Sequence, residues 1–311
     1  MSTNDKTDFL LTGASGFLGS ILHKSLYGAG YSISLLGRNK DARYNFDLLD
    51  NDLRITGDIR TVIHCAGKAH SIPKNEKEIN EFFDVNFLGT KKLCEAFSKD
   101  GKLPMSFIFI SSVAVYGIDM GVLIAEDHPL NGKTPYAKSK ILAEEFLLNW
   151  GEKNNVKIGI LRLPLIAGPN PPGNFNSMIK GIKSGRYLSI GNAEARKSVV
   201  WAEDIANFIP VLAEKGGVYN LTDGYHPSFG ELESGISKIF NKRKPIGIPT
   251  YIAWMIGKIG DLLGSRSPIN SDKLNKITST LTFDDRKART SLGWKSVRVI
   301  DKLNEVLLME E

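Results

Sequence analysis

Two residues in the run Tyr136-Ala137-Lys138-Ser139-Lys140 have side chains suited to moving a proton. On a helix, Tyr136 and Lys140 lie about 40° apart around the axis and about 6 Å apart along it. A tyrosine phenol is a weak acid with an ordinary pKa of about 10. A fixed ammonium nearby stabilises the phenolate and lowers that pKa. The pair therefore predicts a tyrosine of lowered pKa that exchanges a proton with an alcohol or sugar hydroxyl.

Tyrosine and lysine at this spacing also occur on ordinary solvated helices, but a second motif supports a chemical role. The glycine-rich segment 13–19 follows the apolar run Phe9-Leu10-Leu11 and precedes residues with a helical period of hydrophobicity. Glycines let a pyrophosphate approach bare backbone, and a helix N-terminus offers unpaired N–H groups. The spacing Gly-x-x-Gly-x-x-Gly differs from the common Gly-x-Gly-x-x-Gly, yet its place between strand and helix predicts dinucleotide binding. The expected cofactor contacts in this loop are Gly13, Ser15, Gly16, Phe17, Leu18 and Gly19.

Arg38 bears on which dinucleotide is bound. It follows the second apolar run, near the position where NAD sites place an acidic residue for the ribose 2′-hydroxyl. A guanidinium can instead grip a 2′-phosphate with paired hydrogen bonds. The sequence therefore favours NADP(H), with NAD as the alternative if Arg38 is only a solvated loop residue.

The order of apolar segments predicts the scaffold of these motifs. Short, nearly continuous apolar runs alternate with segments of helical period, which is typical of a parallel sheet covered by helices on both faces. The fold class is therefore α/β, with a doubly wound, mostly parallel sheet. The expected strands are 9–11, 31–36, 61–66, 107–110 and 157–163, and the expected helices are 17–28, 78–97 and 135–150.

The pattern loosens after Leu163, where Pro164, Gly168-Pro169 and Pro171-Pro172-Gly173 make a loop-rich passage. We expect a dinucleotide-binding domain at residues 1–164 and a smaller, partly interleaved α/β substrate-binding portion at 165–311. The most apolar late stretch, Ile248 to Leu263, contains Lys258 and Asp261. We expect it to form a buried or partly interfacial helix.

Composition narrows the class of protein. Two cysteines give neither a disulfide framework nor a thiolate metal site, and the five histidines lack ligand spacing, so we expect no metal. The densest basic run, Lys242-Arg243-Lys244, precedes Pro245 and is interpreted as a solvated loop, not a nucleic-acid surface. There is no apolar run of about 18 residues, so we expect no integral membrane segment. The first eight residues are polar and lack a signal core, and we expect the cytoplasm as the location.

Three motifs in order resemble the extended branch of the short-chain dehydrogenase/reductase superfamily. They are the glycine loop, the segment Ser111-Ser112-Val113-Ala114-Val115-Tyr116-Gly117, and the tyrosine–lysine helix. Within that branch the chain is similar to enzymes that remodel nucleotide-activated sugars on a Rossmann-type sheet. The resemblance implies that Ser112 hydrogen-bonds the reacting oxygen and that Tyr136 is the acid or base. It also implies that Lys140 binds the cofactor ribose and lowers the pKa of Tyr136.

The same resemblance implies further cofactor contacts. Asp47 and Leu48 resemble an acidic–apolar pair at the adenine, and Pro164 follows the strand that ends beside the nicotinamide. Cys65, Ala66 and Gly67 resemble the loop after the third strand that runs past the cofactor. Asn86 matches an asparagine that braces the sheet, so we expect it to be a scaffold residue.

On the substrate side, Asn174 resembles a loop asparagine that faces the nucleotide diphosphate. Arg196 and Lys197 lie in a segment whose basic residue meets that diphosphate in the family. The family more often has arginine at the position of Lys197, so either cation is a candidate.

The reaction is narrowed by the residues after Ser112. Related 4,6-dehydratases carry an Asp-Glu pair there, whereas Val113 and Ala114 cannot transfer protons. The resemblance then favours reduction of a UDP-4-keto-6-deoxy-hexosamine for surface polysaccharide synthesis. The alternatives are a nucleotide-sugar C4-epimerase with tightly held NAD, and a non-catalytic NADP-binding sensor. A homodimer is compatible with the sequence, because relatives often pair through the helices equivalent to 78–97 and 135–150.

Overall fold

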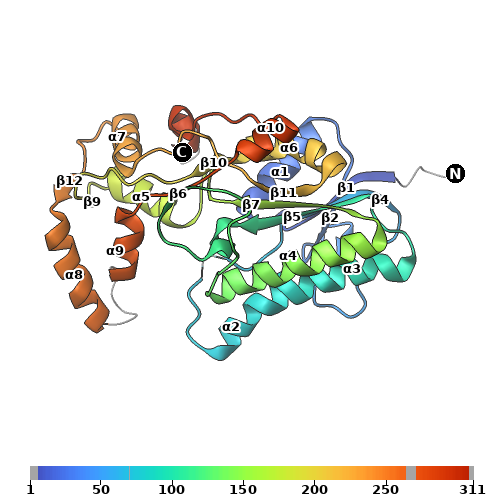
Figure 1. Ribbon diagram of the computed structural model, residues 1–311. Helices are drawn as coiled ribbons and strands as arrows, with labels where there is room; N and C mark the ends of the chain where they lie inside the picture. Colours follow the sequence, from blue (N-terminus) through green and yellow to red (C-terminus); the bar gives the residue numbers. More distant parts are fainter. Residues whose placement is uncertain (1–5, 70, 264–270, 308–311) are drawn as a thin grey trace.

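A computed structural model describes residues 6–69, 71–263 and 271–307, so the first five of the polar N-terminal residues lie outside it (Figure 1). Its central element is a parallel sheet of seven strands in the order β3-β2-β1-β4-β5-β7-β11. Strand order reverses between β1 and β4, and in such sheets ligands bind at the carboxyl ends of the strands beside that switch. The strands are β1 (Lys6–Thr12), β2 (Ile33–Gly37), β3 (Tyr44–Asn45), β4 (Asp58–His64), β5 (Ser106–Ser112), β7 (Lys157–Leu163) and β11 (Gly217–Asn220).

Helices cover both faces of this sheet, as the sequence predicts (Figure 1). One face packs against α1 (Phe17–Gly28), α6 (Ala202–Lys215) and α10 (Arg286–Leu292). The other packs against α3 (Gly89–Asp100) and α4 (Pro135–Asn154). Alternate residues of β5 enter the two cores, Ile108 and Ile110 on one side and Phe107 and Phe109 on the other. The doubly wound α/β class is confirmed.

The helix expected over 78–97 is built from three pieces. α2 (Glu76–Phe83) continues through a π-helical turn, Asp84–Leu88, into α3. Such wide turns concentrate at functional sites in proteins. Here the wide turn carries Asn86, which is fully buried.

Residues on both sides of the domain boundary expected at residue 164 contribute to the central sheet and its helices. After the loop-rich passage it returns to the sheet, where α6 packs on one face and β11 pairs in parallel with β7. Residues 202–220 therefore belong structurally with the first 164 residues.

Apart from α10, most of the remaining C-terminal segments form a smaller unit beside the carboxyl ends of the strands (Figure 1). Its core joins α5 (Gly173–Lys183), α7 (Phe229–Ile239) and α11 (Leu303–Leu307). Short parallel pairs complete it: β8 (Leu165–Ala167) with β10 (Val199–Trp201), β9 (Leu188–Ile190) with β12 (Ile246–Ile248), and β6 (Gly121–Ile124) with β13 (Leu281–Phe283).

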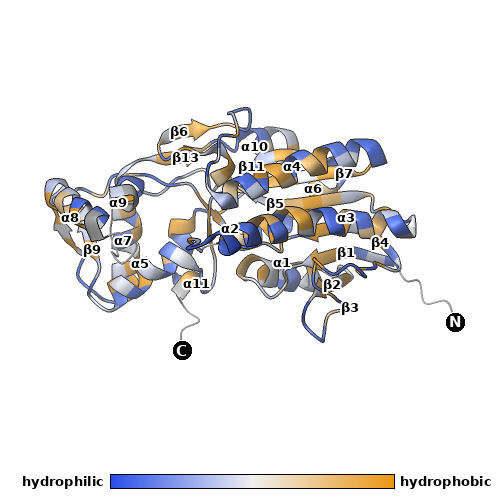
Figure 2. Ribbon diagram, turned by 90° about the horizontal axis from the view of Figure 1, so that it is seen from below, coloured by the Kyte–Doolittle hydropathy of each residue, from blue (hydrophilic) through white to orange (hydrophobic). Residues whose placement is uncertain are grey.

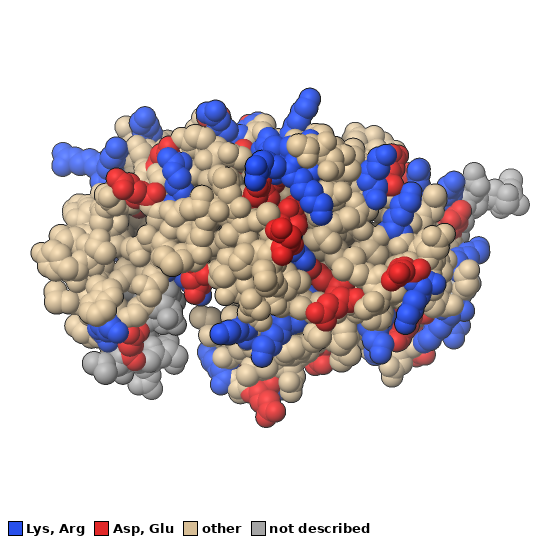
Figure 3. Space-filling model, in the orientation of Figure 1, with Lys and Arg blue, Asp and Glu red and all other residues tan. Residues whose placement is uncertain are grey.

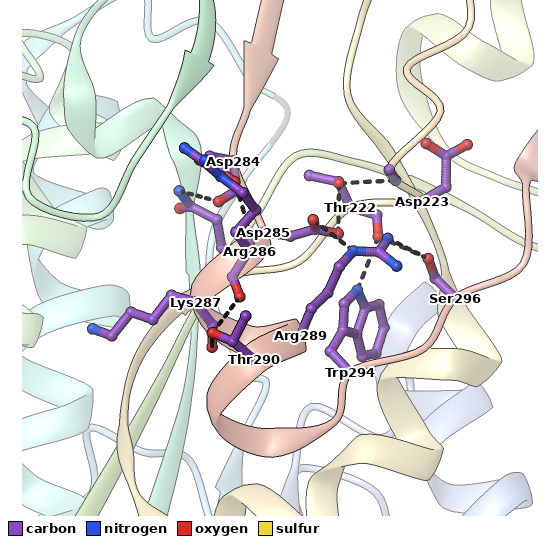
Figure 4. A network of polar contacts seen from close by, with 12 residues as sticks. Thr222, Asp223, Asp284, Asp285, Arg286, Lys287, Arg289, Thr290, Trp294 and Ser296 are labelled. Atoms are coloured by element: carbon purple, nitrogen blue, oxygen red, sulfur yellow. Dashed lines mark hydrogen bonds and ion pairs between the residues drawn. The ribbon is translucent and has the colours of Figure 1, made fainter.

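A polar network ties the C-terminal segments to the end of β11 (Figure 4). Asp285 Oδ2 accepts a 2.9 Å hydrogen bond from Thr222, and its Oδ1 accepts a 2.8 Å bond from Arg289 Nε. Trp294 donates from its indole nitrogen to the Thr222 carbonyl at 3.0 Å. These bonds fix α10 against the sheet.

The apolar stretch expected to form a buried or partly interfacial helix becomes α8 (Thr250–Leu263), beside α9 (Ser271–Thr278). It is helical, but most of its large side chains are exposed, among them Trp254 at 51% and Ile259 at 59%. Of the two alternatives predicted for this helix, burial is wrong, because Ala253, Gly257 and Gly260 form the buried stripe instead. Figure 2 shows the hydrophobic residues of the central sheet lying between its helices, and α8 at the opposite end of the molecule. Among the described residues, no helix has the length and apolarity needed to cross a membrane.

Candidate active site

Ser112 and Tyr136 meet at the carboxyl end of β5. Ser112 is the last residue of β5, and its hydroxyl accepts a 3.2 Å hydrogen bond from the Ala114 amide. α4 begins with Pro135, and its Thr134 cap accepts a bond from the Ala137 amide at 3.1 Å. This start places Tyr136 in the first turn of α4, where its phenol lies close enough to the Ser112 hydroxyl for that hydroxyl to act on its pKa.

The phenol of Tyr136 is in a desolvated position. Burial raises its pKa, while the hydrogen bond with Ser112 acts in the opposite direction. The sequence-based prediction of a lowered pKa is therefore wrong for this arrangement. At neutral pH the phenol keeps its proton, and a protonated phenol can act as an acid.

Lys140 explains the difference, because its ammonium is directed at the sheet. Nζ donates a 2.8 Å hydrogen bond to the Ile110 carbonyl and lies 4.4 Å from the centre of the Phe109 ring. Burial lowers the pKa of Lys140 to about 8. The ammonium therefore donates to a backbone carbonyl of β5, and burial is the largest influence on the pKa of the Tyr136 phenol.

The glycine loop lies against the loop that follows β4. Gly13 has a φ of +75°, and a Cβ built on it would lie 2.5 Å from the Ala66 nitrogen. A Cβ on Gly19 would collide with the carbonyl oxygen of Gly13. Only hydrogen atoms fit at these two positions, so the glycines let the loop pack closely against residues 65–66 and against its own backbone. Gly16 caps α1 and its amide bonds the Gly13 carbonyl at 3.0 Å.

The residues 65–67 connect this loop to Lys140. A Cβ on Gly67 would lie 3.3 Å from Lys140 Nζ and 3.0 Å from Asn86 Oδ1. Burial raises the pKa of Cys65 to about 11, so its thiol is not a thiolate nucleophile at neutral pH. The glycine loop, the 65–67 loop and Lys140 thus form one continuous surface.

Asn86 holds this surface together. Its Oδ1 accepts a 2.7 Å bond from the Lys68 amide, and its Nδ2 donates to the Lys68 carbonyl at 3.0 Å and to Ser139 Oγ at 2.9 Å. The side chain thereby links the loop after β4 to α4. The prediction that Asn86 is a scaffold residue is confirmed.

The sequence analysis predicts a strand at 61–66 but no special role for its residue His64. Its ring lies 2.7 Å from Thr12 Oγ1 and 3.0 Å from Thr90 Oγ1, joining β1, β4 and α3. Burial lowers its pKa to about 3, so the ring is neutral. A histidine inside an otherwise apolar strand was the signal available in the sequence.

A second missed feature is a buried polar chain beneath Ser112. Ser111 donates to Glu144, which forms an ion pair with Arg162 at 2.8 Å. Arg162 also reaches the Tyr116 hydroxyl at 3.2 Å, and that hydroxyl lies 2.7 Å from Asn220 Oδ1. The arginine within the apolar run 157–163 was the signal for this chain.

Arg38 and Asp47 lie beside each other after β2. Their closest charged atoms are 3.8 Å apart, and the Arg38 side chain is 83% exposed. Leu48, the next residue, is buried and packs against Gly89 of α3. The exposed guanidinium therefore stands at the edge of the sheet beyond the glycine loop.

The other expected cofactor residues divide between surface and core. Ser15 is exposed in the loop, whereas Leu18 is buried in the core behind it. The Phe17 ring lies against Gly168, where a Cβ would be 3.2 Å from it. Pro164 is partly buried in the link between β7 and β8.

The two candidate diphosphate cations have different surroundings. Arg196 donates to the His226 carbonyl at 2.9 Å and lies 3.4 Å from Glu231. Lys197 is partly buried, and burial lowers its pKa to about 8 although Asp119 favours its charged form.

Asn174 is exposed in the first turn of α5. No hydrogen bond between it and either cation is recorded within the described part of the chain. The structure therefore brings Ser112, Tyr136 and Lys140 together with the glycine loop and the 65–67 loop. Across the same residues, no group of three or more His, Cys, Asp or Glu side chains is arranged to hold a metal.

Comparison with known proteins gives consistent results. The family described as "NAD dependent epimerase/dehydratase family" matches residues 9–222. The chain is 28% identical to an Escherichia coli O157:H7 protein named N-acetyl-alpha-D-glucosaminyl-diphospho-ditrans,octacis-undecaprenol 4-epimerase, over 91% of this chain and 88% of that protein. It is also 28% identical to GDP-6-deoxy-D-mannose reductase of Pseudomonas aeruginosa, over 71% of this chain and 76% of the reductase.

A solved structure shares the whole fold. The structure of RMD from Pseudomonas aeruginosa complexed with NADPH superposes with a TM-score of 0.74 at 23% identity, covering 97% of this chain and 98% of that one. This likeness also covers residues after 222, where the family match ends.

Proposed function

Because this chain belongs to the NAD-dependent epimerase/dehydratase family, we propose that it transfers hydride at C4 of a sugar carried on a nucleoside diphosphate. The chain is an NAD(P)-dependent enzyme of the epimerase/reductase class, and its cofactor is a nicotinamide dinucleotide. The observation that carries the proposal is the placement of Ser112 and Tyr136 at the carboxyl end of β5, close enough for Ser112 to act on the phenol's pKa, beside the glycine loop and Lys140. The relatives are named as enzymes, so we no longer favour the alternative of a non-catalytic NADP-binding sensor.

The residues present fit a dinucleotide. Gly13 and Gly19 let the loop fold tightly on itself and against Ala66, and the N-terminus of α1, which offers unpaired backbone N–H groups, opens from it. Gly13, Ser15 and Gly16 would hold the pyrophosphate, while Arg38 and Asp47 would lie toward the adenosine end. When bound, the nicotinamide supplies or accepts the hydride.

The chain's own groups handle the proton. Ser112 orients the oxygen at C4 by hydrogen bonding, and Tyr136 donates its proton to that oxygen as the carbonyl becomes an alcohol. The raised pKa of Tyr136 suits this direction, because the phenol is protonated at neutral pH. Lys140 lies on the same helix as Tyr136 and close to Gly67. Its ammonium has three donors, so it would bind the cofactor ribose while keeping its bond to the Ile110 carbonyl.

The proposed reaction is reduction of a UDP-4-keto-6-deoxy-hexosamine with NADPH, for surface polysaccharide synthesis. Three observations support it: the exposed Arg38, the protonated Tyr136, and the identity with a relative named as a 6-deoxy-sugar reductase. Residues 1–164 with 202–220 would bind the cofactor. The C-terminal unit around α5 would bind the sugar nucleotide, with Asn174, Arg196 and Lys197 as the candidate contacts.

Epimerisation at C4 is the second candidate. It is favoured by the relative that matches 91% of this chain, which is named a 4-epimerase. An epimerase needs the same three side chains but keeps its cofactor, because oxidation and reduction alternate on one bound molecule.

One experiment separates the two reactions. The purified protein is denatured and the released dinucleotide is identified, before and after dialysis, and the protein is then assayed with NADPH and a UDP-4-keto-6-deoxy-hexosamine. A reductase loses NADP on dialysis and oxidises NADPH with the keto-sugar. Retained NAD and interconversion of UDP-sugar epimers without NADPH oxidation would replace the reductase by the epimerase.

A further inference from the structure

Helix α8 buries its small residues and exposes its large apolar side chains. The residues that face the rest of the protein are Ala253, Gly257 and Gly260, all buried. A helix on a water-soluble surface normally turns its large apolar residues toward the core. Here they face outward, with exposed fractions of 67% for Tyr251, 51% for Trp254, 53% for Met255, 42% for Ile256 and 59% for Ile259.

The surface over α8 is correspondingly poor in charge. In Figure 3 the end of the molecule that carries α8 is largely free of charged side chains, with basic groups gathered above it. Ile246, just before the helix, adds a side chain that is 75% exposed. Contiguous apolar surface of this kind marks a binding face.

Basic residues border this face. Lys242, Arg243 and Lys244 are exposed in the loop between α7 and β12, a few residues before α8. Lys258 lies on α8 itself, with its ammonium 4.9 Å from the centre of the Trp254 ring. Residues 242–263 contain these four basic residues and one acidic residue, Asp261, which gives a formal charge of +3.

We propose that residues 242–263 bind the surface of an anionic lipid bilayer, with α8 lying in the plane of the interface. Tyrosine and tryptophan favour the boundary between lipid headgroups and acyl chains. Lysine and arginine beside an apolar helix face attract anionic headgroups. The exposed residues of α8 supply the apolar contact with the bilayer, and the basic loop supplies the attraction to anionic headgroups.

A second copy of this chain fits the face less well. A 14-residue helix is about 21 Å long, and its exposed side offers a few hundred Å², against about 800 Å² per partner in a stable interface. A two-fold interface would also bring each cationic segment near its own copy, with no described acidic cluster to oppose it.

Tryptophan fluorescence can report this binding directly. Of the four tryptophans, Trp150, Trp201 and Trp294 are at most 9% exposed, so Trp254 alone is positioned to sense lipid. With full-length protein and vesicles of phosphatidylglycerol and phosphatidylcholine, we expect co-sedimentation and a blue shift of emission. With pure phosphatidylcholine vesicles, or in 0.5 M sodium chloride, we expect binding at least tenfold weaker.

A matched pair of double variants tests the assignment to α8. Met255→Ser/Ile259→Ser keeps Trp254 and should weaken vesicle binding at least tenfold. Met105→Ser/Ile72→Ser removes two similarly exposed apolar side chains elsewhere, 64% and 78% exposed, and should bind as the parent does. Lys242→Glu/Arg243→Glu/Lys244→Glu should remove the preference for phosphatidylglycerol.

Two results would overturn the proposal. One is a parent protein that neither sediments with anionic vesicles nor shifts its emission. The other is a dimer, detected by analytical ultracentrifugation without lipid, that Met255→Ser/Ile259→Ser dissociates while the control variant does not. Turnover of a water-soluble sugar nucleotide should be unchanged in both double variants, so failure here is distinct from failure of the proposed reaction.

Discussion

Glu144 and Arg162 face each other as a buried ion pair, with Arg162 Nη2 2.8 Å and Nε 3.1 Å from the same carboxylate oxygen. Their side chains are 2% and 7% exposed. Glu144 lies one helical turn beyond Lys140 on α4, and Arg162 lies on β7. The pair therefore fixes the rotation of the helix that presents Tyr136 and Lys140.

Removing one partner should be strongly destabilising. Glu144→Ala leaves Arg162 buried without its counter-charge, and we expect a loss of about 3–5 kcal/mol in the free energy of unfolding. The neighbouring Glu145→Ala, at an exposed position, should cost less than about 0.5 kcal/mol. Urea unfolding followed by circular dichroism measures both, and equal losses would show that the ion pair has no special role.

Tyr136→Phe should abolish turnover without abolishing cofactor binding. Loss of the acid–base group is expected to lower kcat by about 10²–10⁴-fold. Tyr27→Phe, an exposed change on α1, serves as the control. Steady-state kinetics with NADPH and keto-sugar, together with cofactor titration, make the comparison. A variant with near-normal kcat would remove Tyr136 from the chemistry.

Arg38→Ala should change the choice of dinucleotide. A charged hydrogen bond to phosphate contributes about 1.5–3 kcal/mol, so we expect the KM for NADPH to rise about 10–100-fold while that for NADH changes little. Arg54→Ala, another exposed arginine, should leave both values as they are. Equal effects on the two cofactors would argue that Arg38 does not contact a 2′-phosphate.

Lys197 should make nucleotide binding depend on pH. Its pKa of about 8 means that the ammonium is charged below that pH and neutral above it. The affinity for UDP, measured by calorimetry, should therefore fall as pH rises from 7 to 9. Lys197→Gln should bind UDP weakly with a flatter profile, whereas Arg196→Gln should keep the parental pH dependence. The reverse assignment of the two variants would identify Arg196 as the diphosphate ligand.

His64 should contribute to acid sensitivity. Its folded-state pKa of about 3 lies below the ordinary value of 6.5, so below pH 6.5 the unfolded chain takes up a proton that the folded chain does not. Stability is therefore lost as pH falls, by about 2 kcal/mol from this group between pH 6.5 and 5. His64→Gln should lose less over that interval, as measured by urea unfolding at each pH. Parallel losses in parent and variant would contradict the prediction.

The local pattern predicted the sheet well because each central strand is buried on both faces. Runs such as Phe107-Ile108-Phe109-Ile110 have no alternation, and helix-period segments separate them. The glycine loop could also be predicted from the sequence, since Gly13 and Gly19 occupy positions where no Cβ fits. These features depend on residues close together in the chain.

What the sequence did not reveal depends on distant contacts. The direction of the Lys140 ammonium is set by the Ile110 carbonyl, and the exposed side of α8 is set by α9, which follows it. Hydrophobicity alone predicted that Ile248–Leu263 would form a buried or partly interfacial helix, and did not show which side chains would be exposed. The stripe of Ala253, Gly257 and Gly260 was visible in the sequence, but not the neighbour against which it packs.

The pairing of β11 with β7 also has consequences for truncated forms of this protein and for its folding during synthesis. A fragment that stops near residue 164 would leave β7 as an open sheet border, with unpaired amides and carbonyls along its length. It would also leave bare the apolar side that α6 covers. During synthesis the same border stays open until residue 220 has left the ribosome, so the nascent chain depends on some fifty residues of intervening sequence to close it.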